Sequence, residues 1–402
     1  MITEPVAALA GDLTEDDLPA YLYDLEALAA HARTVRAALP GRVELYYAVK
    51  ANPAPEILTA LAPHVSGFEV ASGGELTHVR QTAPEVPVAF GGPGKTEAEL
   101  RLALDRGVHR IHVESESELR LLAQLAARRP APPGGRADGC VADVLLRVNL
   151  PTGARALDGA ALTMGGRPTP FGLDPDRLAG CLPLPAGSRL RLRGIHAHLA
   201  SGLDAPAQLE LAERITSWAR ELTDRHGLPL EEANIGGGMQ VDYTHPERRF
   251  DWAGYGAGLA ALADRHPGTV LRIEPGRALT GYCGWYVTDV LDVRYSGGEA
   301  FAVLRGGTHH LRTPAAKQHD HPFTVLPRDG WRHPWPRPGA HGEPVTLAGQ
   351  LCTPKDVLAR RVPVDRIRAG DRVAFALAGA YAWNISHHAF LMHPAPAFYF
   401  LG

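Results

Sequence analysis

A lysine ends an apolar stretch of the chain, residues 43–50 (VELYYAVK). A strand that finishes on Lys50 would hold its amine in a partly desolvated pocket, which lowers the pKa of the amine and favours imine formation with an aldehyde. The alternative is a lysine whose stem follows the strand while its ammonium group reaches water. Lys50 is therefore a candidate nucleophile whose role depends on its neighbours.

Two later motifs offer groups for a phosphate and for an aromatic ring nitrogen. The glycines of IGGG (235–238) allow backbone N–H groups to close around a phosphate, although such a run is also an ordinary tight turn. In IEPGR (273–277), a buried Glu274 can keep a pyridine nitrogen protonated and Arg277 can pair with phosphate. The alternative is that Glu274 and Arg277 pair with each other.

The motif GIHAHLAS (194–201) puts His196 and His198 on the same face of an expected strand. One interpretation is a pair of metal ligands. The other is an imidazole that stacks on a flat cofactor, with Ser201 near its phosphate. Because no third ligand with a recognisable spacing appears, stacking by one histidine is favoured and no metal is predicted. The other histidine is expected to pack in the core.

Two motifs near the end of the chain carry further reactive groups. GQLCTPKD (349–356) places Cys352 and Asp356 at the end of an expected strand. GAY (379–381) supplies the phenol of Tyr381, which could reach a phosphate. The alternatives are a buried structural thiol at Cys352 and an ordinary β-sheet tyrosine at Tyr381.

The hydrophobic pattern supplies the elements that would bring these groups together. Eight strand-like runs, most of them followed by a helical stretch, cover residues 43–50, 67–71, 86–90, 110–114, 141–149, 191–199, 233–235 and 270–274. Amphipathic helices are predicted at 205–225 and 252–264, and Ser115 and Glu118 have capping-box spacing. Alternating strands and helices predict parallel crossovers, and eight such units predict an α/β fold built on a (β/α)8 barrel with its active site at the carboxyl ends of the strands.

From about residue 282 the pattern becomes β-rich, without helices between the strands. We expect a barrel domain over 35–281 and a second β domain made of 1–34 and 282–402, which includes an early strand near 21–24. Three irregular stretches are expected to be loops: 129–139, 151–172 and 314–343. Residues 151–172 follow a barrel strand, on the face where such barrels place their active sites. Residues 314–343 are a candidate substrate or interface loop.

Composition excludes several classes of protein. The 402 residues are 45% hydrophobic and 21% charged, with a net charge of −3, so nothing favours nucleic acid or an anionic membrane as a partner. An acidic N-terminus without an apolar core argues against a secretory signal, and no apolar run has transmembrane length. Four widely spaced cysteines fit a reducing cytoplasm.

Taken together, the motifs resemble the fold type III (alanine racemase-like) decarboxylases that depend on pyridoxal 5′-phosphate (PLP), the superfamily of diaminopimelate, ornithine and arginine decarboxylases. The resemblance runs in order through YYAVKANP, GFEVASGGEL, FGGPGKTEAEL, HAHLASG, IGGG, EPGR, GQLCTPKD and GAY, from about Tyr21 to the C-terminus. It implies an enzyme with PLP as its cofactor, a small-molecule amino-acid substrate and a homodimer with shared active sites.

The resemblance also implies residue roles. Lys50 would form the imine, His198 would stack on the PLP ring and Glu274 would pair with the pyridinium. The groups around the phosphate would be Ser201, Gly236, Gly237, Gly238, Arg277 and Tyr381. Cys352 and Asp356 would reach across the dimer interface, with Cys352 as a proton donor.

Two departures from the family pattern bear on the substrate. Glu69 stands where relatives usually place Asp, and Thr353 follows Cys352 where relatives that act on amine-tailed substrates usually have an acid. The segment GGTHHLRTPAAKQHDHPF (306–323) resembles decarboxylases of siderophore pathways that act on citrate-conjugated diamino acids. Arg312 and His310 would then meet a polycarboxylate, the alternative being a solvated loop. A decarboxylase of diaminopimelate or another basic amino acid, a racemase and a non-catalytic PLP-binding homologue are the competing hypotheses.

Overall fold

The structure of this protein is a computed structural model that describes residues 2–129, 139–151, 160–317 and 319–402. Its contacts divide the chain into two compact units. The barrel unit comprises 31–240 and 250–278, and the β unit comprises 1–30, 241–249 and 279–402. The short segment 241–249 thus belongs with the β unit, although it lies between barrel elements in the sequence.

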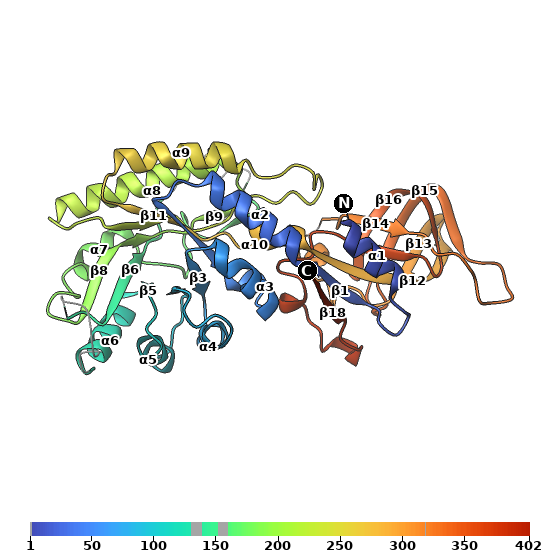
Figure 1. The fold of residues 1–402 in the computed structure, drawn as a ribbon, viewed down its shortest axis with the longest axis horizontal. Coiled ribbons are helices and arrows are strands. Elements are labelled where there is room, and N and C mark those ends of the chain that lie inside the picture. The colour runs from blue at the N-terminus through green and yellow to red at the C-terminus, as the bar shows by residue number, and fades with distance from the viewer. Residues whose placement is uncertain (1, 130–138, 152–159, 318) are drawn as a thin grey trace. The chain divides into compact units, whose positions relative to one another are not determined.

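The barrel unit contains a closed barrel of parallel strands (Figure 1). Its strands, in order around the barrel, are β2 (Val43–Ala48), β3 (Gly67–Val70), β4 (Val88–Phe90), β5 (Arg110–Val113), β6 (Ala142–Arg147), β8 (Leu190–His196), β10 (Glu232–Asn234) and β11 (Val270–Ile273). The register of β11 against β2 closes the ring, with Leu271 opposite Val43. The predicted α/β barrel is confirmed, and each predicted strand overlaps an observed one.

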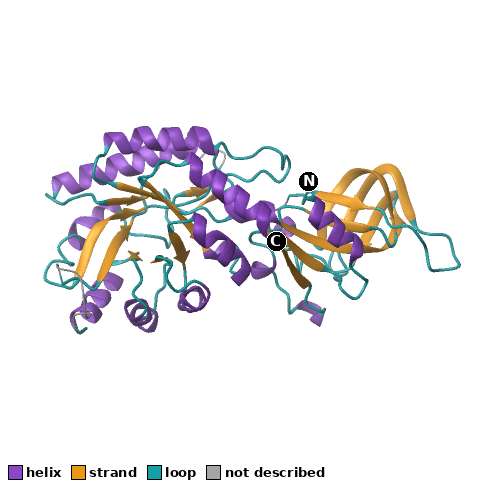
Figure 2. Cartoon of the chain, in the orientation of Figure 1, coloured by secondary structure: helices purple, strands orange, loops and turns teal. Residues whose placement is uncertain are grey.

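Helices cover the outside of this barrel, as Figure 2 shows. They are α2 (Leu25–Ala38), whose first turns fall in the β unit, α3 (Pro55–Leu61), α4 (Gly73–Thr82), α5 (Glu97–Asp105), α6 (Glu116–Ala127), α7 (Pro175–Cys181), α8 (Ala205–Arg225) and α9 (Trp252–Arg265). The Ser115 side chain accepts from Glu118 N at the start of α6, as its spacing predicts. In a complete capping box the Glu118 side chain would accept from the backbone N–H of Ser115. Here it pairs instead with Lys95 Nζ at 2.8 Å.

Charged side chains fill the barrel interior at the amino ends of its strands. Arg110, the first residue of β5, contacts Glu232 at 2.6 Å and Asp143 at 2.8 Å. Arg272 of β11 is fully buried and contacts Glu232 at 2.8 Å. Because each buried charge meets an opposite charge, this network is a compensated part of the core. The carboxyl ends of the strands are therefore the end available for chemistry.

The β unit is built on a mostly antiparallel sheet. Its main path runs β14 (Phe323–Leu326), β17 (Arg372–Phe375), β12 (Gly284–Ser296), β13 (Glu299–Leu304), β15 (Gly339–Ala348) and β16 (Val357–Arg368). The early strand β1 (Ala20–Asp24) pairs antiparallel with β12 and parallel with β18 (Ala397–Leu401). Helix α1 (Glu4–Asp12) packs on this sheet through Val6 and Ala10. A short α10 (Arg277–Thr280) follows β11 at the boundary of the two units.

The three expected loops either differ from their predictions or lie partly outside the described residues. The stretch 314–343 is not a single loop, because it holds part of α11 (Thr313–Lys317), all of β14 and the start of β15. The many Pro and Trp residues of this stretch led to its prediction as a loop, although it contains the short strand β14. Most of 129–139 and the stretch 152–159 lie outside the described residues. No helix in the described part of the chain is long and apolar enough to cross a membrane.

Candidate active site

Lys50 follows β2 in a short 3-10 turn, Val49–Ala51, at the carboxyl end of the strand. Its Nζ donates to Glu69 Oε2 at 2.5 Å, and Glu69 comes from the neighbouring strand β3. The Lys50 side chain is 42% exposed, whereas that of Glu69 is 6% exposed. The Lys50 side chain is therefore partly exposed, while its amine is held by a buried carboxylate.

The glycine loop after β10 is packed so tightly that side chains do not fit. A Cβ on Gly237 would lie 2.2 Å from the carbonyl oxygen of Glu274, and one on Gly238 would lie 2.2 Å from that of Ala200. Gly236 has a φ of +74°, which suits glycine, and its Cβ would meet the ring of His198 at 2.7 Å. These positions therefore admit only glycine, and the loop brings backbone rather than side chains up to His198.

His198 lies beyond the end of β8, and its Nδ1 accepts from Gly237 N at 3.3 Å. Burial, together with the nearby Arg147 and Lys50, lowers the pKa of His198 to about 3. The ring is therefore neutral at physiological pH. A neutral ring of fixed orientation beside a glycine loop suits stacking on a flat cofactor.

Glu274 follows β11 and is only 8% exposed. Its Oε1 accepts from Asn234 Nδ2 at 2.6 Å. Burial, reinforced by the negative charge of Glu69, raises the pKa of Glu274 to about 7. A cationic partner would strongly stabilise the ionised form of such a carboxyl group, and a protonated pyridine nitrogen would be such a partner.

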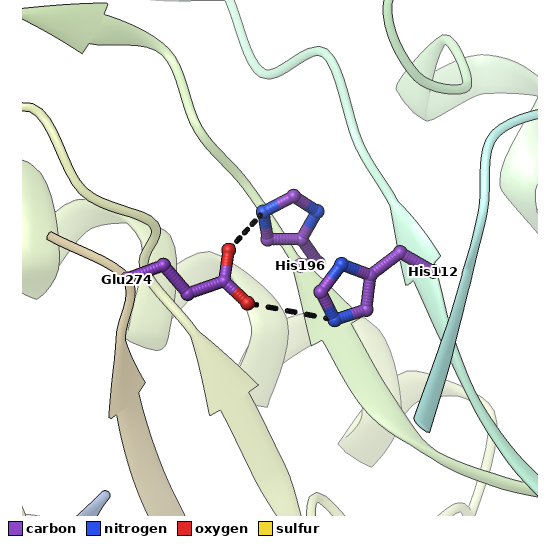
Figure 3. Close-up of side chains that lie close together, drawn as sticks. All are labelled: His112, His196 and Glu274. Atoms are coloured by element: carbon purple, nitrogen blue, oxygen red, sulfur yellow. Dashed lines mark ion pairs between the residues drawn. The ribbon is translucent and has the colours of Figure 1, made fainter. Parts of the chain in front are cut away.

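Two buried imidazoles face the same carboxylate (Figure 3). His196 Nε2 lies 3.5 Å from Glu274 Oε2, and His112 Nε2 lies 3.8 Å from Oε1. The two rings stack on each other at 4.3 Å. The three donor atoms lie within 4.8 Å of one another and are of types that zinc accepts. No metal was predicted here, and neither His112 nor Asn234 was among the predicted site residues.

These groups fit PLP: an accessible lysine, a glycine cradle, a neutral stacking imidazole and a buried acid for the ring nitrogen, all at the carboxyl ends of barrel strands. Residues 25–281 match the family described as pyridoxal-dependent decarboxylase, pyridoxal binding domain. The chain belongs to this family. It is a PLP-dependent decarboxylase, which confirms the predicted cofactor and enzyme class.

Similar proteins cover nearly the whole decarboxylase. It is 38% identical, over 95% of this chain and 93% of the relative, to the 2-[(L-alanin-3-ylcarbamoyl)methyl]-2-hydroxybutanedioate decarboxylase of Staphylococcus aureus. It is 30% identical, over 90% of each chain, to a diaminopimelate decarboxylase of Bacteroides thetaiotaomicron. The fold is that of diaminopimelate decarboxylase from Helicobacter pylori (a mutant complexed with L-lysine), with a TM-score of 0.82 at 23% identity, covering 98% of this chain and 93% of that one.

Of the remaining predicted site residues of the decarboxylase, Ser201 and Arg277 belong to the barrel unit, and Asp356, Cys352 and Tyr381 belong to the β unit. Asp356 is buried and accepts from Thr308 N at 2.6 Å and Leu351 N at 2.8 Å, so it shapes the loop that carries the exposed Cys352. Tyr381 has a φ of +49°, a strained conformation of the kind found at functional sites. Their roles toward PLP and substrate remain predictions.

Two further residues were predicted to bind substrate. His310 is buried, its Nδ1 lies 3.0 Å from Tyr286 Oη, and its Nε2 lies 3.0 Å from the carbonyl oxygen of Pro394. Arg312 is exposed, and its guanidinium donates to the Ile385 carbonyl oxygen at 3.4 Å. Arg312 is thus the more available of the two for an anionic ligand, and both roles remain predictions.

The residues that sequence reasoning missed share a signal. Asn234 ends β10 directly before the glycine loop, and His112 lies one residue before the end of β5. Polar residues near the carboxyl ends of buried barrel strands are expected to face the active site. A search for every such residue would have found both.

Proposed function

We propose that this protein removes the α-carboxylate of an amino acid that is amide-linked to citrate, a step of siderophore biosynthesis. The observation that carries the proposal is the 38% identity along nearly the full length of the staphylococcal enzyme. That enzyme's name describes a citrate skeleton with one terminal carboxylate joined, as an amide, to the side-chain amine of a diamino acid. Thr353, in place of an acid, and the cationic Arg312 also favour a carboxylate-rich substrate over an amine-tailed one.

Bound PLP supplies an electron sink for the pair released when the bond between Cα and the carboxylate breaks. The chain's own residues prepare that step. Lys50 would hold the cofactor covalently and later release the product amine, with Glu69 as the acceptor of its N–H. The glycine loop, Ser201, Arg277 and Tyr381 would bind the phosphate. Glu274 would hold the proton on the ring nitrogen, and Cys352 would deliver a proton to Cα.

A second candidate function is decarboxylation of diaminopimelate. The Bacteroides enzyme supports it, with 30% identity over 90% of each chain. A racemase is less well supported, because nothing in GQLCTPKD (349–356) suggests the catalytic tyrosine that removes the α proton in that reaction. A silent PLP-binding homologue is less well supported, because Lys50, Glu274, Arg277, Cys352 and Tyr381 are all present.

Substrate choice is tested by incubating the PLP-loaded enzyme with each candidate and following loss of CO₂ by mass spectrometry. We expect kcat/KM for the citrate amide of 2,3-diaminopropionate to exceed that for diaminopimelate, ornithine and lysine by at least about 100-fold, since a polar site left unpaired by the wrong substrate costs several kcal/mol. The Arg312→Ala variant should lose most of this preference. Comparable turnover of diaminopimelate would favour the second candidate function instead.

We also propose that the enzyme is a cytoplasmic homodimer with shared active sites. The four cysteines are all free thiols, which suits a reducing compartment. The family resemblance supports the dimer, with Lys50 and Cys352 of one site coming from different protomers.

This arrangement predicts complementation between two inactive variants. A mixture of Lys50→Ala and Cys352→Ala chains, allowed to exchange subunits, should recover about a quarter of wild-type activity, because half of the dimers carry one intact site. Each variant alone serves as the control. Heterodimers purified with two different tags that remain inactive would contradict shared sites.

A further inference from the structure

Glu274 is held by an amide whose orientation the structure fixes. Asn234 Oδ1 accepts from Gly236 N at 3.0 Å, so its Nδ2 carries the two remaining hydrogens. One of them is donated to Glu274 Oε1 at 2.6 Å, and His112 Nε2 lies 3.4 Å from the same nitrogen. His112 Nε2 is then an acceptor, and its proton lies on Nδ1. His112 therefore does not donate to Glu274.

The second oxygen of Glu274 faces a different imidazole. His196 Nε2 lies 3.5 Å from Oε2, at the outer limit of a hydrogen bond (Figure 3). Neither ring nitrogen of His196 has a hydrogen-bond partner among the residues that the structure describes, although the residue is buried. A buried imidazole without a partner is costly, and Glu274 Oε2 is an acceptor that lies close to Nε2.

The charges around Glu274 decide how His196 can act. The groups that face it are Glu69 of β3, Lys50 after β2, Arg272 of β11, His112 of β5 and His196 of β8. Burial lowers the pKa of both histidines well below the usual value, and neighbouring cations and imidazoles add to this. Both rings are neutral, so His196 would act as a hydrogen-bond donor rather than as a cation.

We propose that His196 is a positioning residue for Glu274, whose neutral Nε2–H donates to the carboxylate oxygen that Asn234 leaves free. Two donors, one on each oxygen, fix the plane of the carboxylate and stabilise its ionised form. The His112 ring, whose Nε2 contacts Asn234 Nδ2, stacks on the His196 ring and so supports its orientation. This inference rests on the proposed role of Glu274 as partner of the ring nitrogen, and it gives His196 a role other than the core packing expected for one of the two histidines.

The test is the protonation of the cofactor ring in the loaded enzyme. PLP labelled with ¹⁵N at the ring nitrogen reports, through its chemical shift, whether the shared proton lies on the ring or on Glu274. In His196→Phe, which keeps a planar ring against His112 but loses the donor, the shift should move toward that of a neutral pyridine. kcat should fall roughly tenfold or more, with KM within about threefold, since a hydrogen bond to a charged group is lost.

Two further variants separate this role from packing. His196→Gln places an N–H near the former Nε2 and should restore the wild-type shift, whereas His112→Phe should leave that shift near wild type because His112 does not donate to Glu274. If His196→Phe does not fold, His196→Leu is read in the same way. A loaded His196→Phe or His196→Leu enzyme with the wild-type shift and kcat would overturn the proposal. A wild-type enzyme whose ring nitrogen is unprotonated would instead refute the role of Glu274.

Discussion

Lys50→Ala protein is expected to lack the visible absorption band of bound PLP and to lose decarboxylation by at least about 10³-fold. The variant removes both the covalent anchor of the cofactor and the amine that would release the product. Borohydride treatment of the wild-type enzyme, followed by peptide mapping, should find PLP attached to the peptide that carries Lys50. The absorption spectrum and a CO₂ assay of the purified variant measure the two losses.

Lys355→Ala is the matched control, since Lys355 is an exposed lysine of the β unit. It should retain both the absorption band and the borohydride-trapped peptide. A band of wild-type intensity in Lys50→Ala would refute the role of Lys50. The same outcome would leave the open lysine beside Glu69 without a function.

Glu274→Gln is expected to lower kcat by about 10²–10³-fold while leaving PLP content and KM largely unchanged. Gln has nearly the same size and can still accept from Asn234 Nδ2, but an uncharged amide cannot hold a proton on the ring nitrogen. The loss should therefore appear in the chemical step rather than in binding. Steady-state kinetics and the PLP content of the purified variant measure it.

The pH dependence of the two enzymes should differ in a defined direction. The pKa of Glu274 is raised to about 7 in the protein alone, and pairing with a cationic ring nitrogen favours the ionised form and lowers that value. Wild-type kcat/KM should rise with pH through a value at or below about 7 and then level off. Glu274→Gln should lack this rise.

Glu44→Gln is the control for a lost carboxylate near β11. Glu44, the second residue of β2, contacts Arg272 Nη2 at 2.5 Å, whereas Glu274 follows the carboxyl end of β11. This variant should unfold more easily yet keep kcat within about threefold. A Glu274→Gln enzyme that is merely unstable, with wild-type kcat when folded, would contradict the assigned role.

The protonation states of the barrel site follow from burial more than from charge. Desolvation is the largest cause both of the raised pKa of Glu274 and of the lowered pKa of His196 and His198. The site therefore combines neutral imidazoles with an acid poised near neutrality. Such a site favours a cation arriving with the cofactor over a second carboxylate.

Local sequence determined much of this protein. Apolar runs bounded by glycine and polar residues predict the barrel strands, since a strand buried on both faces must be continuous in hydrophobicity. The amphipathic repeat predicted α8 over the bounds observed, Ala205–Arg225. Lys50, the glycine loop and Glu274 follow such strands, so their position at one end of a barrel could be inferred from order alone.

The tertiary structure determines which side chains meet in the site, and the order of the motifs along the sequence does not reveal this. Sequence alternation placed His196 and His198 on one face, yet the chain leaves the strand after His196, and the two rings meet different partners, Glu274 and the glycine loop. The contact of His112 with His196 joins residues 84 positions apart in the chain, through strands that pair with β6 between them. The curvature of the barrel brings such residues together, because the side chains that point inward converge from every strand regardless of their distance in sequence.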